Sequence, residues 1–293
     1  MQALADDHSA LELVLMGCHA WVVRLVCRML RDSRAPDARN TVASTLESPE
    51  RLELAFALGL PRDERVCRVA AARGDLEMLR VAHAGGCALE CQRARSKWGC
   101  LICEDAARGG HRHVLEWLKT HGCAWDARTC TAAARGAHVG LLRWLRSEGC
   151  EWSEATPNAL ASAGCIEALE WAIRDHCAHS PRDIVRAAAA AGQLDLLRWY
   201  RLNYRIFCNV AADPAILEHA ARGGHTEVME WACSLGCKLT PWVCLAAVCT
   251  GQLGALKWAR SNGCEWNRQK CRAFADLGWS EVAAWMDSAE GKM

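Results

Sequence analysis

The chain has 293 residues, of which 52% are hydrophobic, and its 35 Lys and Arg residues are balanced by 34 Asp and Glu residues. A formal charge of +1 gives no bulk attraction to nucleic acid or to acidic membranes. The start of the chain has no basic segment, and the longest uncharged run, residues 239–256, is interrupted by Pro241 and Gly251, so we expect neither a signal peptide nor a membrane span.

Residues 1–34 precede the regular part of the sequence. Leucine, valine and tryptophan recur between Leu11 and Leu30, and this predicts one or two apolar helices. The run from Leu25 to Leu30, with Val26–Cys27–Arg28 at its centre, resembles the end of an F-box, the helical segment that recruits ubiquitin ligases. The resemblance implies a substrate adaptor; the alternative is that the segment caps the exposed end of the structure that follows.

One pattern recurs from about residue 37 onward. A tryptophan, which we call the anchor, takes the same place in seven segments, and Val81 takes it in an earlier one. The anchors are Trp117, Trp144, Trp171, Trp199, Trp231, Trp258 and Trp285. Counted from Val81, they follow one another at intervals of 36, 27, 27, 28, 32, 27 and 27 residues. A period near 27 predicts stacked repeats, and Leu54, placed 27 residues before Val81, indicates a degenerate repeat that begins near Asp37.

Each repeat is predicted to form two helices. The first is rich in small residues, as in Cys130–Ala134, and a glycine seven residues before the anchor suits a tight turn. The second carries large apolar residues around the anchor, as in Leu142–Leu145, and ends at a glycine such as Gly149. We therefore predict an all-α solenoid of stacked helix-turn-helix repeats over residues 35–288, with the anchors in its core and a tail of residues 289–293.

Two segments of the repeat resemble the ankyrin repeats. Ala106–Ala107–Arg108–Gly109–Gly110–His111 is similar to the turn of that family, and Gly122–Cys123–Ala124–Trp125–Asp126 is similar to its helix exit. The Thr-Pro-Leu-His motif of the family is absent, and each repeat is about six residues shorter than the usual 33. The resemblance implies shortened ankyrin-like hairpins with few or no β-hairpin fingers. The Trp- and Cys-rich form resembles the repeat arrays associated with protists and large DNA viruses.

Most of the cysteines follow the repeat. Eleven of the 19 lie either six residues after an anchor or fourteen before one. This pattern is typical of small buried residues, so we expect reduced thiols and an intracellular protein. Cys87, Cys91, Cys100 and Cys103 have a spacing that can hold zinc, but Cys87 and Cys103 also belong to the repeat pattern, so we expect no metal.

Other polar residues follow the repeat as well. His111, His138 and His225 occupy one position beside the inter-helix turn, which favours packing or capping over catalysis. The residue before each anchor alternates in charge, and this predicts that opposite charges of neighbouring repeats face each other. The series is Arg80, Glu116, Arg143, Glu170, Arg198, Glu230 and Lys257.

The period is broken by two insertions, before Trp117 and before Trp231. Insertions in repeat proteins map to loops on one face, and exposed Trp, Tyr and Arg are enriched at binding hot spots. Arg95, Trp98, Tyr204 and Arg205 are therefore the predicted contact residues. The alternative is that these are tolerated surface insertions.

Since no catalytic site or phosphate-binding loop is visible, the sequence predicts a protein-interaction scaffold without enzymatic activity. We expect a monomer in the cytoplasm, or in the host cytoplasm if the protein is viral. It would need no cofactor, and its partner would be another protein, with neither nucleic acid nor membrane bound. The adaptor function implied by residues 1–34 is the alternative.

Overall fold

The computed structural model describes residues 64–89, 100–204 and 215–288, together with Pro49, Leu52, Glu53, Phe56, Arg62 and Asp213. The predicted N-terminal segment of residues 1–34, the tail of residues 289–293 and most of the degenerate repeat lie outside the described residues. The chain divides into two compact parts, an N-terminal part (Met1–Glu151) and a C-terminal part (Trp152–Met293).

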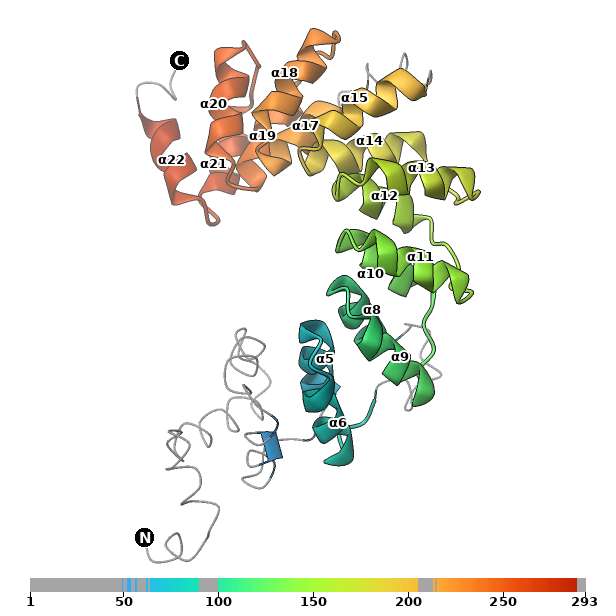
Figure 1. The fold of residues 1–293 in the computed structure, drawn as a ribbon. Helices are drawn as coiled ribbons and strands as arrows, with labels where there is room; N and C mark the ends of the chain where they lie inside the picture. Colours follow the sequence, from blue (N-terminus) through green and yellow to red (C-terminus); the bar gives the residue numbers. More distant parts are fainter. Residues whose placement is uncertain are drawn as a thin grey trace, which may run out of the picture. The chain divides into compact units, whose positions relative to one another are not determined.

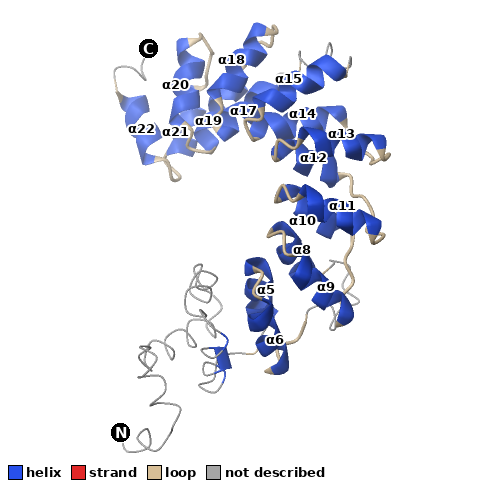
Figure 2. Cartoon of the chain, viewed as in Figure 1, coloured by secondary structure: helices blue, strands red, loops and turns tan. Residues whose placement is uncertain are grey.

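All regular elements in the described part of the chain are helices, sixteen in number, and no strand occurs among them (Figures 1 and 2). They form eight helical hairpins, one for each anchor residue from Val81 to Trp285. The first helices are α5 (Glu64–Arg73), α8 (Leu101–Arg108), α10 (Ala127–Arg135), α12 (Ala155–Ser162), α14 (Pro181–Ala190), α17 (Ala215–Gly223), α19 (Pro241–Cys249) and α21 (Arg268–Ala275). The second helices are α6 (Leu76–Ala84), α9 (Arg112–Thr120), α11 (Val139–Ser147), α13 (Ile166–Arg174), α15 (Leu194–Asn203), α18 (Thr226–Ser234), α20 (Leu253–Ser261) and α22 (Ser280–Asp287).

The hairpins stack in chain order within each part. In the N-terminal part α5 packs on α8, and α8 packs on α10. In the C-terminal part the series of packed first helices runs α12, α14, α17, α19 and α21. The two helices of each hairpin also pack on each other. The all-α prediction is confirmed, and this sequential packing is consistent with a helical repeat solenoid.

The core of each second helix is a narrow stripe. The residues three before, two before and one after the anchor are buried in all eight helices, as at Leu141, Leu142 and Leu145 of α11. These positions are three or four residues apart and therefore lie on one face of a helix. The face packs on the small residues of the first helix; α10 buries Thr129 to Ala134 without a break. Each hairpin brings only part of a core, and stacking completes it.

The prediction that the anchor tryptophans lie in the core is wrong. All seven are half-buried, because the anchor lies 100° around the helix from the buried residue that follows it and so falls at the edge of the stripe. Several of their rings pack on aromatic residues of the loops instead. Trp125 meets Trp144 at 5.4 Å between ring centres, and Trp152 meets Trp171 at 5.1 Å, both edge to face.

Side chains at the turns tie one hairpin to the next. His111, His138 and His225 lie six residues before an anchor, and each Nε2–H donates to a backbone carbonyl of the preceding hairpin, at 3.1, 3.0 and 3.2 Å. The acceptors belong to Ala72, Arg108 and Ala190. Gln193 makes the equivalent bond to Ser162 at 3.0 Å. The predicted packing role of these histidines is confirmed.

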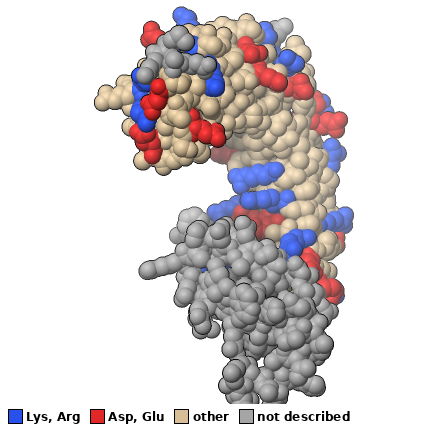
Figure 3. Space-filling view, turned by 90° about the vertical axis from the view of Figure 1, so that its left-hand side faces the viewer, with Lys and Arg blue, Asp and Glu red and all other residues tan. Residues whose placement is uncertain are grey.

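Four of the seven alternating charges form ion pairs within their own helices. Arg80 pairs with Glu77, Glu116 with Arg112, Glu170 with Arg174 and Arg198 with Asp195. Each of these pairs lies within one helix at a spacing of three or four residues, where side chains meet most easily. The ion pairs of these four residues therefore do not join neighbouring repeats. On the face shown in Figure 3, basic and acidic side chains lie close to one another.

Candidate functional site

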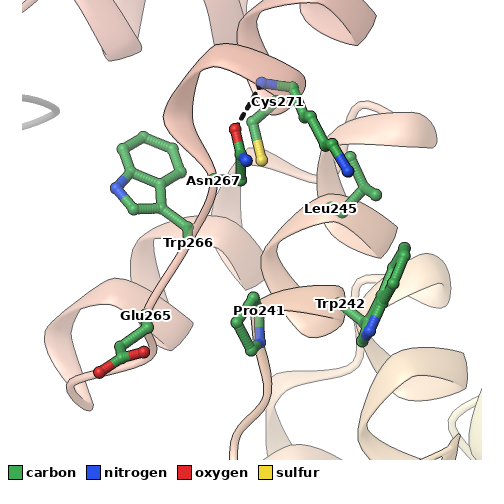
Figure 4. Close-up of a pocket in the computed structure, with 8 residues that line it drawn as sticks. Pro241, Trp242, Leu245, Glu265, Trp266, Asn267 and Cys271 are labelled. Atoms are coloured by element: carbon green, nitrogen blue, oxygen red, sulfur yellow. Dashed lines mark hydrogen bonds between the residues drawn. The ribbon is translucent and has the colours of Figure 1, made fainter.

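An open groove lies between the first turns of α19 and α21 in the C-terminal part (Figure 4). Its volume is about 380 Å³, within the range of ligand pockets. The indoles of Trp242 and Trp266 lie on opposite sides of it, and Pro241 lies between them. The lining residues are Pro241, Trp242, Leu245, Glu265, Trp266, Asn267, Lys270 and Cys271.

The sequence explains why both helices begin at this groove. Thr240 has an extended backbone, and Pro241 follows as the first residue of α19, where a missing N–H costs no helical hydrogen bond. At the start of α21 the side chain of Asn267 accepts a hydrogen bond from the backbone N–H of Lys270 at 2.9 Å. This cap fixes the first turn of α21 and the loop before it.

Two side chains contact the ring of Trp266, and two hydrogen bonds hold the loop that carries it. The guanidinium of Arg260 lies over its ring, 5.0 Å from the ring centre, and Trp285 packs against it at 6.2 Å. Arg260 also donates to the carbonyl of Cys264 at 2.7 Å, and the Cys264 thiol donates to the carbonyl of Thr240 at 3.2 Å. The loop that carries Trp266 is thus bonded to the start of α19, so this side of the groove is preorganised for a ligand.

Trp242 has no comparable structural role. Its side chain is 59% exposed, and it occupies neither the anchor position nor the loop position that Trp125, Trp152 and Trp266 share. Tryptophan is costly to expose and is enriched at binding hot spots. Packing between repeats therefore explains why position 266 has a tryptophan. It does not explain the tryptophan at position 242.

The side chains that line the groove are mostly apolar, with one charge of each sign. Burial raises the pKa of the Cys271 thiol to about 11, so the thiol is neutral at pH 7 and acts as part of an apolar wall. The carboxylate of Glu265 and the ammonium of Lys270 form no ion pair with the described residues. Two indoles, a proline and a leucine between two opposite charges form a surface for binding, with no nucleophile paired to a base.

The structure describes one of the four predicted contact residues, Tyr204. Arg95, Trp98 and Arg205 are outside the described residues. Tyr204 follows α15 and is half-buried, with its ring stacked on Tyr200 at 4.6 Å and edge to face with Trp199 at 5.8 Å. Burial raises the pKa of Tyr204. Its role in partner contact stays a prediction. The groove was not predicted from the sequence, although Trp242 is a tryptophan outside the repeat pattern and next to a proline.

Of the four candidate zinc ligands, Cys87, Cys100 and Cys103 are described and buried, and Cys91 lies outside the described residues. A hydrogen bond to Cys100 and burial raise the pKa of the Cys103 thiol. No group of three or more His, Cys, Asp or Glu side chains in the described ranges could hold a metal ion.

The cysteines that follow the anchors have a shared structural role. Cys150, Cys177 and Cys264 direct their thiols to the backbone carbonyl 24 residues earlier, at 3.1, 3.6 and 3.2 Å. The equivalent Cys123 corrects the prediction of reduced thiols, because it is disulfide-bonded, whereas fourteen other described cysteines carry free thiols. Spacing along the chain could not reveal this bond, since pairing depends on the distance between side chains.

No helix of the described residues has the length and apolar character that crossing a membrane requires. No protein-family model matches the chain, and no curated protein sequence matches it either.

Proposed function

We propose that the chain is a non-catalytic protein-interaction scaffold built from shortened ankyrin-like repeats, and that the groove between α19 and α21 is its contact site. The observation that carries the proposal is the 59% exposed Trp242 beside the braced Trp266. One indole held by its neighbours and one open to solvent give a partner a large apolar contact at little conformational cost.

The proposal includes the other sequence-based expectations. The partner is another protein, the scaffold acts as a monomer in the cytoplasm, and no cofactor takes part. Recruitment of a ubiquitin ligase by residues 25–30 stays the alternative, and those residues lie outside the described part of the chain. The two functions are compatible, since a substrate adaptor also needs a surface that binds its substrate.

A random peptide library displayed on phage tests the proposal. Peptides selected on the parent protein should bind at least about tenfold more weakly to Trp242→Ala, because truncation of a hot-spot tryptophan costs about that much or more. Phe274→Ala is the matched control, since Phe274 lies on α21, is 42% exposed and does not line the groove. Selected peptides that bind both variants as tightly as the parent would place the contact site elsewhere.

A further inference from the structure

The groove offers hydrogen-bond donors in excess of acceptors. The indole N–H groups of Trp242 and Trp266 make no hydrogen bond with the described residues, and neither does the ammonium of Lys270. Asn267 uses its side-chain oxygen in the helix cap, so its amide N–H₂ remains as a further donor. The acceptor among the lining side chains that is left for a ligand is the carboxylate of Glu265.

The excess of hydrogen-bond donors determines which kind of ligand fits the groove. A partner that fills the groove must bring acceptors for several donors, few donors of its own, and apolar bulk for two indoles and a proline. A proline-rich peptide meets all three conditions, because proline has no backbone N–H and its extended form leaves the carbonyls free of internal hydrogen bonds. Its preformed conformation also loses little entropy on docking against aromatic side chains.

Size and charge narrow the choice further. The groove is lined by the first turns of two helices and the loop before one of them, a short surface that a few residues of a partner chain can cover. A few residues of extended chain fit better than a helix, whose anchoring side chains span two turns. Glu265 lies at one side of the groove, below Trp266 in Figure 4, and is complementary to a basic residue that flanks the prolines.

We propose that this groove binds a proline-rich extended peptide segment of a partner protein, with a proline between Trp242 and Trp266 and a flanking Arg or Lys at Glu265. The inference rests on the proposed function and specifies its ligand. The indole N–H groups donate to carbonyls of the peptide, and Asn267 and Lys270 supply further donors along the same wall.

Fluorescence polarisation with the full chain tests the proposal. The probe is a labelled octapeptide, Arg-Pro-Pro-Leu-Pro-Pro-Leu-Pro, and the comparison peptide has alanine at every proline. We expect saturable binding of the probe, at least about tenfold weaker binding of the alanine peptide and of the Trp242→Ala variant, and unchanged binding to the Phe274→Ala control.

Charge reversal supplies an independent readout that does not depend on truncating an aromatic residue. The parent should prefer the probe with Arg over one with Glu at its first position by about two- to fivefold, and Glu265→Lys should reverse this preference. Equal binding of the proline and alanine peptides would overturn the proposal. Tighter Trp242-dependent binding of an oligothymidine would overturn it too, as would selection of library peptides that depend on Trp242 and lack proline. That last result would contradict the proline-rich ligand and not the proposed function. Library peptides whose binding does not depend on Trp242 would contradict both the ligand and the proposed contact site.

Discussion

The imidazole of His138 lies directly over Gly110, the turn glycine of the preceding hairpin. A Cβ atom at Gly110 would lie 2.7 Å from the ring, closer than real contacts allow. Gly110 also has a φ of 80°, in the left-handed region that favours glycine. The ring sits there because its Nε2–H donates to the carbonyl of Arg108. Glycine is thus needed for the shape of its own turn and for the bond that joins two hairpins.

The first prediction separates these two requirements. Gly110→Ala should cost about 1–2 kcal/mol for the left-handed backbone and about 1–3 kcal/mol more for the displaced ring. Gly149→Ala is the matched control, since Gly149 has a φ of 84° and nothing lies within 4 Å of a Cβ atom there. Urea unfolding of both variants measures the difference, and equal losses would show that the ring moves aside at no cost.

The second prediction concerns two residues that adopt the left-handed conformation without being glycine. Ala137 has a φ of 58° and His176 a φ of 56°, at positions where other repeats have glycine. Ala137→Gly and His176→Gly should each stabilise the protein by up to about 1 kcal/mol. The backbone strain that glycine relieves in the folded state exceeds the cost of the entropy that it adds to the unfolded chain. Ala187→Gly, inside α14, should instead destabilise by about 1 kcal/mol. A lower melting temperature for both left-handed variants would contradict the prediction.

The helices and turns were predictable from the sequence because the period of 27 residues repeats a buried stripe in all eight hairpins and a turn glycine in seven of them. The depth of the anchors was not predictable, since Leu142 and Trp144 are both apolar and only the packed structure shows which one faces the first helix. The groove was missed for a related reason. Periodicity treats repeats as equivalent, whereas Trp242 matters because the other repeats have nothing like it at that position.

The third prediction ranks three apolar residues by their burial. Leu142→Ala should destabilise by about 2–5 kcal/mol, because the side chain is completely buried and its removal leaves a cavity. Trp144→Ala should cost about 2 kcal/mol, since its side chain is only half-buried and its ring packs against Trp125 and Arg112. Trp242→Ala should change stability by less than about 0.5 kcal/mol. Denaturant unfolding of the three variants checks the order, and a loss at Trp242 equal to that at Trp144 would give Trp242 a structural role.

The fourth prediction follows from the disulfide at Cys123. The chain has 19 cysteines and the disulfide at Cys123 takes two thiols, so titration of the unfolded, unreduced protein should find at most 19 − 2 = 17. Reduction before unfolding should raise the count to 19. Cys123→Ser should raise the count without reduction by one, because the thiol of its disulfide partner is freed. A count of 19 without reductant would restore the prediction of a fully reduced chain.

The last prediction concerns His219 of α17. Burial, with Arg222 and Arg186 nearby, lowers the pKa of His219, and Asp213 and Asp183 oppose the shift only in part. The unfolded chain therefore binds a proton at this residue more readily than the folded chain does. Stability is complete above the ordinary pKa of histidine, about 6.5, and falls as the pH decreases from there toward the lowered pKa of the folded state. His219→Gln removes this titration, so its melting temperature should fall less between pH 7.5 and 5 than that of the parent. Replacement of the exposed His113 by Gln tests whether any histidine substitution has this effect. If the two variants and the parent lose the same stability, His219 does not carry the dependence on pH.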